Sequence, residues 1–209
     1  VRAATTSQAQ AAVAMDRVFD IAQRTRQPWP GTAEVYSRVS AAARDLGVSQ
    51  NEVLRFTESL NQAVALSGAS AAEAEAGMIQ LAQGLASGVL RGDELNSVLE
   101  QLPVVADVIA SHLGVTRGEL RKMGADGKIT ATDIMDAFAA AEGELATGFA
   151  NSTPTIAQGF MMIRDAASKF FGEIMTSSGV LGAFSGALVF LARKFDTIDI
   201  RVSKNTKIS

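Results

Sequence analysis

The segment "HLGVTRGELRKMGADGKITATDIMDAF", residues 112–138, determines the fold because it stops and restarts a helix within a few residues. Gly114 ends one helix, since glycine is the residue that most readily adopts the left-handed conformation after a helix. Thr116 and Glu119 then have the spacing of a capping box, which opens the next helix. A second helix stop at Gly127 and a second cap at Thr130 follow before residue 131. A chain interrupted this often predicts short helices that fold back on one another.

The turn inside this segment, "GADGKITATDIMDAF" (124–138), has some features of an EF-hand calcium loop. With Gly127 at loop position 6, the first ligand position falls on Lys122. A hard dication needs anionic oxygens, and an ammonium cannot supply one. We therefore interpret the segment as a turn in which Gly127 ends one helix and Thr130 caps the next, with Asp133 at N3. We expect no metal site.

The rest of the chain has the same kind of signals. Two further capping boxes open helices upstream, at Ser49–Glu52 and Ser70–Glu73. The segments "QPWPG" (27–31) and "NSTPT" (151–155) interrupt helices with proline. No segment before residue 197 alternates as a strand would. The sequence predicts an all-α fold, a compact antiparallel bundle of about eight to ten short helices, and leaves open an extended C-terminal helical hairpin.

Composition narrows the class of protein. The chain has 209 residues, 47% hydrophobic and 20% charged, which is enough for one large or two small cores. Its net charge of −3 gives no field that would gather nucleic acid, so we expect no specific nucleic-acid partner. The lack of cysteine excludes disulfides and thiolate zinc sites. Because residue 1 is valine and no basic region with an apolar run follows, we expect no signal peptide and a segment cut from a longer protein.

Patterns of catalytic residues are absent from the sequence. His112 is the only histidine, and without cysteine or a second histidine it has no obvious zinc partners. The loop "GVLRGDE" (88–94) lacks the lysine and the hydroxyl of a phosphate loop, and no G-x-S-x-G elbow occurs. We expect no enzyme, no catalytic residue and no cofactor.

The segment "IMTSSGVLGAFSGALVFLA", residues 174–192, has 19 residues without a charge. As a helix it would just reach across a bilayer core, and Gly182 and Gly186 form a GxxxG pair that permits close helix contact. Its strongly apolar part, 180–192, has only 13 residues, which favours a helix buried in protein. Helix contact and membrane entry both stay open. An apolar seam that precedes this segment includes Ile163.

Residues 88–138 together closely resemble the tape measure domain of long-tailed bacteriophages and prophages. The resemblance rests on the order of these residues: Gly88, Leu90, Gly92, Glu94, Leu95, Leu99, Glu100, Pro103, Leu113, Gly114, Val115, Gly118, Glu119, Leu120, Gly124, Gly127, Ile129 and Thr130. This order is far more specific than any single short motif in the chain.

The resemblance implies a structural protein of the phage tail and supplies no catalytic residues. Tape measure proteins run through the lumen of the tail tube, set tail length during assembly and leave ahead of the DNA at genome ejection. The implied location is the virion, with the host cytoplasm during assembly. The implied partners are the tail tube protein, tail assembly chaperones and tail tip proteins. Self-association and contact with the host inner membrane stay open.

The pattern of breaks also divides the chain. We expect a tape measure helical domain over residues 1–150, an apolar helical hairpin over 151–197 and a tail over 198–209. A molecular ruler needs long uninterrupted helix, whereas the first of these segments is interrupted repeatedly, so we expect a globular element and not the ruler portion. Two alternative functions are a membrane-active segment that helps DNA across the inner membrane and, less favoured, a cell-wall hydrolase domain.

Overall fold

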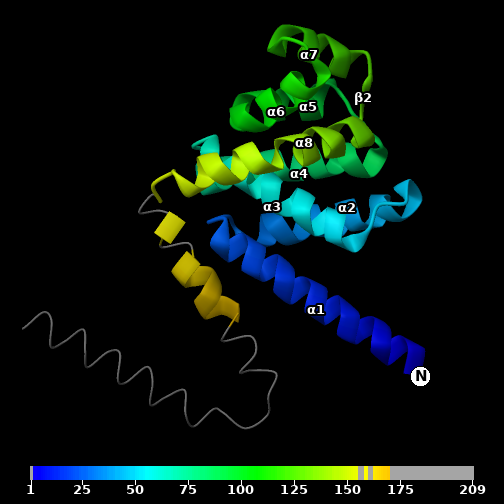
Figure 1. Ribbon diagram of the computed structural model, residues 1–209, viewed down its shortest axis with the longest axis vertical. Helices are drawn as coiled ribbons and strands as arrows, with labels where there is room; N and C mark the ends of the chain where they lie inside the picture. Colours follow the sequence, from blue (N-terminus) through cyan, green and yellow to red (C-terminus); the bar gives the residue numbers. More distant parts are fainter. Residues whose placement is uncertain (1, 155–157, 160–161, 170–209) are drawn as a thin grey trace, which may run out of the picture. The chain divides into compact units, whose positions relative to one another are not determined.

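Short helices account for most of the computed structural model, which describes residues 2–154, 158–159 and 162–169 (Figure 1). The elements within residues 2–154 are α1 (Arg2–Arg24), α2 (Trp29–Leu46), α3 (Gln50–Leu66), α4 (Ala71–Ser87), β1 (Val89–Leu90), α5 (Gly92–Gln101), α6 (Pro103–Leu113), α7 (Arg117–Ala125), β2 (Ile129–Thr130) and α8 (Ala131–Ala150). Residues 162–169 are also helical. The predicted all-α helical bundle is confirmed.

The capping boxes predicted from the sequence open four of these helices. The cap residues are Ser49 before α3, Ser70 before α4, Thr116 before α7 and Thr130 before α8. In each case the backbone N–H of the cap residue donates to the carboxylate three residues later, over 2.8 to 2.9 Å. Each cap hydroxyl in turn accepts the N–H of that carboxylate residue, so helix starts that would otherwise lack partners are satisfied.

The predicted glycine stops are also present. Gly114 and Gly127 both have φ of 66°, in the left-handed region that favours glycine. The reversal at Gly127 lets Lys128 N–H donate to Met123 O over 2.9 Å, which satisfies a carbonyl at the end of α7.

The expectation of no strand before residue 197 is wrong at one place. Val89 pairs with Thr130 and Leu90 pairs with Ile129 in a two-residue antiparallel ladder. Two residues are too few to alternate visibly in sequence. They pair because the connector after α4 and the connector before α8 run side by side, and Ala131 N–H extends the pairing with a 2.9 Å bond to Gly88 O.

The helices pack around one apolar core. In Figure 1, α5, α6 and α7 gather at one end of the bundle, while α8 runs along α4. α8 contacts α3 and α6, and α2 contacts α4. The largest fully buried side chains are Phe138, Leu60, Met78, Leu81, Leu85, Leu90, Leu95, Leu102, Ile109, Leu120, Ile129 and Ile134. Ile163, expected on an apolar seam, is instead 67% exposed.

Three helical glycines, Gly77, Gly84 and Gly124, receive leucine side chains from the 88–138 segment, and we call them the glycine notches. A Cβ added at Gly84 would lie 2.5 Å from Leu90 Cδ1, and one added at Gly77 would lie 2.7 Å from Leu102 Cδ1. A Cβ at Gly124 would overlap Leu95 in the same way. The three leucines are fully buried, so they have no free space into which they could move.

The capping glutamates make the stability of the fold depend on pH. Hydrogen bonds from the side chain and backbone of the cap serine lower the pKa of Glu52 and Glu73, and bonds from the backbone and hydroxyl of Thr116 lower the pKa of Glu119. A carboxyl with a lowered folded pKa stabilises the fold fully above its unfolded pKa, about 4.3 for glutamate, and that contribution is lost as pH falls through the folded value.

We therefore expect the melting temperature to decrease when the pH is lowered below about 4.3, and these three glutamates should account for part of the decrease. The measurement is thermal melting by circular dichroism, for the wild type and for a variant with Glu52→Gln, Glu73→Gln and Glu119→Gln. Glutamine keeps an oxygen that can accept the capping bond but does not titrate, so the variant should show a shallower pH slope. Equal slopes would contradict the assignment.

Candidate functional site

One side of α8 exposes small and acidic side chains, and we call this surface the α8 face. Its exposed residues are Ala139, Ala140, Glu142, Gly143, Glu144, Ala146 and Thr147. The helix sequence contains four carboxylates and no lysine or arginine. The opposite side is held in the core by Ile134, Phe138 and Leu145. Small side chains on the outside leave the α8 backbone open to close approach by another chain.

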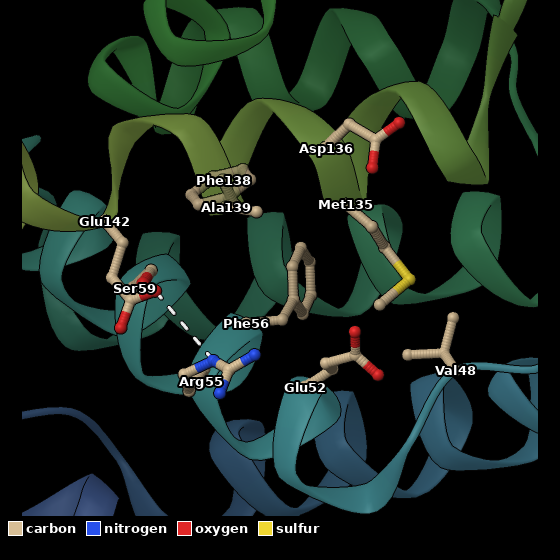
Figure 2. A pocket seen from close by; sticks show the side chains of 10 residues that line it. All are labelled: Val48, Glu52, Arg55, Phe56, Ser59, Met135, Asp136, Phe138, Ala139 and Glu142. Atoms are coloured by element: carbon tan, nitrogen blue, oxygen red, sulfur yellow. Dashed lines mark ion pairs between the residues drawn. The ribbon is translucent and has the colours of Figure 1, made fainter.

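A hollow of about 140 Å³ lies between α3 and α8 (Figure 2). Phe56 from α3 and Phe138 from α8 meet edge to face in its wall, with ring centroids 5.3 Å apart. Figure 2 shows Met135 beside the Phe56 ring, and Glu142 directed toward Arg55. The Arg55 Nε to Glu142 Oε2 distance is 3.9 Å, so the pair closes one end of the hollow only loosely.

A larger hollow of about 660 Å³ lies on the other side of α8, next to α6 and the end of α3. Its lining is mainly apolar and small: Leu66, Val104, Val108, Ala137, Ala140, Ala141, Leu145 and Gly148. Asp107, His112 and Glu144 supply its polar atoms, together with Ser111. α8 is thus bordered by a hollow along each side.

An arginine binds one of the carboxylates of the larger hollow. Asp107 accepts bonds of 2.5 and 2.6 Å from Arg117, and these bonds raise the pKa of the Arg117 guanidinium. Among the described residues, no hydrogen bond joins His112 to Asp107 or Glu144. Within the same residues, no group of three or more acidic or histidine side chains is placed to hold a metal ion.

The carboxylates of the EF-hand-like turn have other partners. Asp126 pairs with Lys128 over 3.0 Å, and Asp133 accepts the Thr130 backbone N–H over 2.9 Å and its hydroxyl over 2.6 Å. The segment acts as a turn followed by a capped helix, as the sequence predicted.

The signature residues lie apart from the α8 face, in turns, helix starts and core between α4 and α8. The buried signature residues include Leu90, Leu95, Leu99 and Ile129. The left-handed backbone conformation occurs at Gly88, Gly114 and Gly127. Helix starts contain others, namely Gly92, Glu94, Pro103, Glu119 and Thr130. The structure brings Leu90 and Ile129 together in the strand pair. These positions determine how residues 88–138 fold, and they do not converge on one surface cluster.

A comparison with protein-family models decides the class of this protein. The family described as tape measure protein matches residues 1–176, which includes every helix from α1 to α8. This chain belongs to the tape measure protein family. Comparisons with curated proteins and with solved structures gave no match. Membership in the tape measure family gives the chain a structural role in the phage tail.

The family match extends well beyond the signature. It begins upstream of residue 88 and ends downstream of residue 138, so the first four helices also belong to the tape measure domain. The predicted contact residues Gly182 and Gly186, and the whole 174–192 segment, lie outside the described residues. Among the described helices, none is both long enough and apolar enough to cross a membrane.

The α8 face and its two hollows were not predicted from the sequence. The run "AAAEGELATG" (139–148) was a possible signal, because small residues continue there after the buried Phe138. The hollows themselves depend on how far α3 and α6 lie from α8 in this tape measure domain, and local sequence does not encode that spacing.

Proposed function

We propose that residues 1–150 form a compact docking module of the tape measure chain, which holds other tail components and does not itself measure length. Other parts of the chain then set tail length during assembly, and the whole chain leaves the tail tube at genome ejection. The module would reside in the lumen of the tail tube in the virion and in the host cytoplasm during assembly.

The observation that carries this proposal is the repeated reversal of the chain. As one continuous helix, 150 residues would extend about 225 Å. Instead the glycine stops and capping boxes divide them into helices of 9 to 23 residues. At the glycine notches, three leucines pack against glycines that a continuous helix would hold apart from them.

The α8 face is the proposed docking surface. On this face Glu142 is matched only loosely by Arg55, and no ion pair joins Glu144 within the described part of the chain. We infer a partner segment with small or apolar side chains toward α8 and lysine or arginine at its margins. The tail tube protein, a tail assembly chaperone and a tail tip protein are the candidates. A second copy of the α8 face is disfavoured as the partner, since the carboxylates of the two copies would repel each other.

Site-specific crosslinking in assembled tails tests the docking surface. Ala140→Cys in the full-length chain places a thiol in the larger hollow, at an exposed position where a small side chain can be changed. After labelling with a maleimide–benzophenone, irradiation should join this residue to another tail protein, identified by mass spectrometry.

The matched control is Ala41→Cys, an exposed alanine on α2, which has few contacts with α8. We expect the yield of crosslinks to one tail protein to be several-fold higher from residue 140 than from residue 41. Equal yields from the two positions would argue against the α8 face as the docking surface.

A further inference from the structure

The turn between α1 and α2, residues 25–28, is fixed rigidly to the core. Asn61 Nδ2 donates to Thr25 Oγ1 and Thr32 Oγ1 over 3.0 Å each, and all three side chains are buried. The two threonine hydroxyls donate in turn to Ile21 O and Pro28 O. This buried network holds both ends of the turn in one position relative to α3.

α2 begins at this turn without a cap of its own. Its N-cap residue is Pro28, which offers no side-chain acceptor, and the first backbone N–H of the helix belongs to Trp29. That N–H donates over 3.0 Å to Asp165 Oδ2, and this acceptor lies 136 positions later in the chain. Asp165 is 7% exposed, and its other oxygen accepts two 3.0 Å bonds from Arg164. Asp165 therefore caps α2 from a distance.

The same turn also caps the end of α8. Arg26 Nη2 donates to Phe149 O over 3.3 Å, to Ser152 O over 3.4 Å and to Ser152 Oγ over 3.1 Å. Its guanidinium lies 4.1 Å from the centre of the Phe149 ring, within cation–π range. Arg26 has φ of 57°, a conformation that no other non-glycine residue among the described ones adopts. Since this conformation is strained for arginine, its contacts with α8 must offset the strain.

We propose that the α1–α2 turn is a two-point clamp for the chain where it leaves the bundle. Arg26 holds the chain at residues 149–152, where α8 ends, and the Trp29 N–H holds the chain again at Asp165. The compact unit that contains α1 to α8 ends at Asp165, the residue that makes the second contact. Loss of the Asp165 contact would release the helical residues 162–169 while the bundle stays folded. The clamp does not depend on the docking role proposed above.

Hydrogen–deuterium exchange of the purified chain, read by mass spectrometry, tests the clamp. Asp165→Ala removes the cap, and a lost cap of typical strength should raise exchange over residues 162–169 about 5-fold. Exchange in α3 and in α8 before Phe149 should stay as in the wild type. Asp165→Asn keeps an acceptor oxygen and should restore most of the protection. Arg164→Ala, which removes a neighbour and leaves the cap, should have a smaller effect than Asp165→Ala.

Two arginine variants test the first contact. Arg26→Ala loses the contacts with α8 and keeps the backbone strain, whereas Arg26→Gly loses the contacts and relieves the strain. Both should raise exchange at the end of α8 and over 162–169, and Arg26→Gly should leave the bundle more stable than Arg26→Ala does. Unchanged exchange over 162–169 in Asp165→Ala would overturn the clamp. So would a rise spread evenly over α1 to α8, or an effect of Arg26→Ala confined to α8.

Discussion

Tails assembled on a tape measure chain that contains residues 1–150 twice are expected to keep their parental length. The second copy should fold into a second bundle, because its caps and glycine stops are encoded within it. If these residues served as extended ruler, the duplication would lengthen the tail by about 225 Å, at about 1.5 Å per residue. Negative-stain electron microscopy of purified tails resolves such a difference directly.

A matched insertion completes this experiment. A helix-forming stretch of the same length, without glycine, proline or capping boxes, placed at the same point, should lengthen the tail by up to about 225 Å. If the duplicated module lengthened the tail as much as the continuous helix does, the compact and non-measuring role of the module would be refuted.

Gly124→Val is expected to destabilise the domain by about 1–3 kcal/mol, the usual cost of overpacking a buried site. A Cβ at this position would overlap Leu95 Cδ2 and would also lie 3.3 Å from Leu95 Cβ. Leu95 is fully buried and cannot swing away, so α5 and α7 would have to separate. Against a total stability of about 5–15 kcal/mol for a typical domain, this is a large loss, and urea denaturation would measure it.

Gly118→Val is the control for this variant, since it is the same change in the same helix. A Cβ at Gly118 would meet only Thr116 Oγ1, at 3.9 Å, so we expect an effect within about 0.5 kcal/mol. Leu95→Ala combined with Gly124→Val should destabilise the domain by less than the sum of the two single changes, because the deleted leucine side chain leaves the space that valine needs. Equal destabilisation by the two valines would mean that the notch is not the cause.

The helix starts and stops of this fold could be predicted because their signals are local. Thr130 and Asp133 are three residues apart, and their mutual hydrogen bonds form as soon as one helical turn does. Gly114 and Gly127 act through their own backbone conformations. For such features, the residues that make the contact and the residues that show the pattern are the same.

Contacts between distant residues could not be predicted in this way. Asp165 caps Trp29 across 136 positions, and nothing in the sequence near Asp165 shows that an uncapped helix lies beside it. The glycine notches have the same character, since Gly77 resembles any helical glycine until Leu102 is placed against it. The resemblance of residues 88–138 to tape measure domains indicated the family, but the α8 face emerged only from the packing of α3 and α6 on either side of α8.

The strand pair of β1 and β2 has a consequence for the contour of the chain. Leu90 and Ile129 are ladder partners, so residues 91–128 depart and return at points separated by about 5 Å. α5, α6 and α7 therefore form an excursion that starts and ends at the same point between α4 and α8. Insertions or deletions among these three helices would enlarge or reduce the part of the bundle that they form, while the end of α4 and the start of α8 would stay the same distance apart.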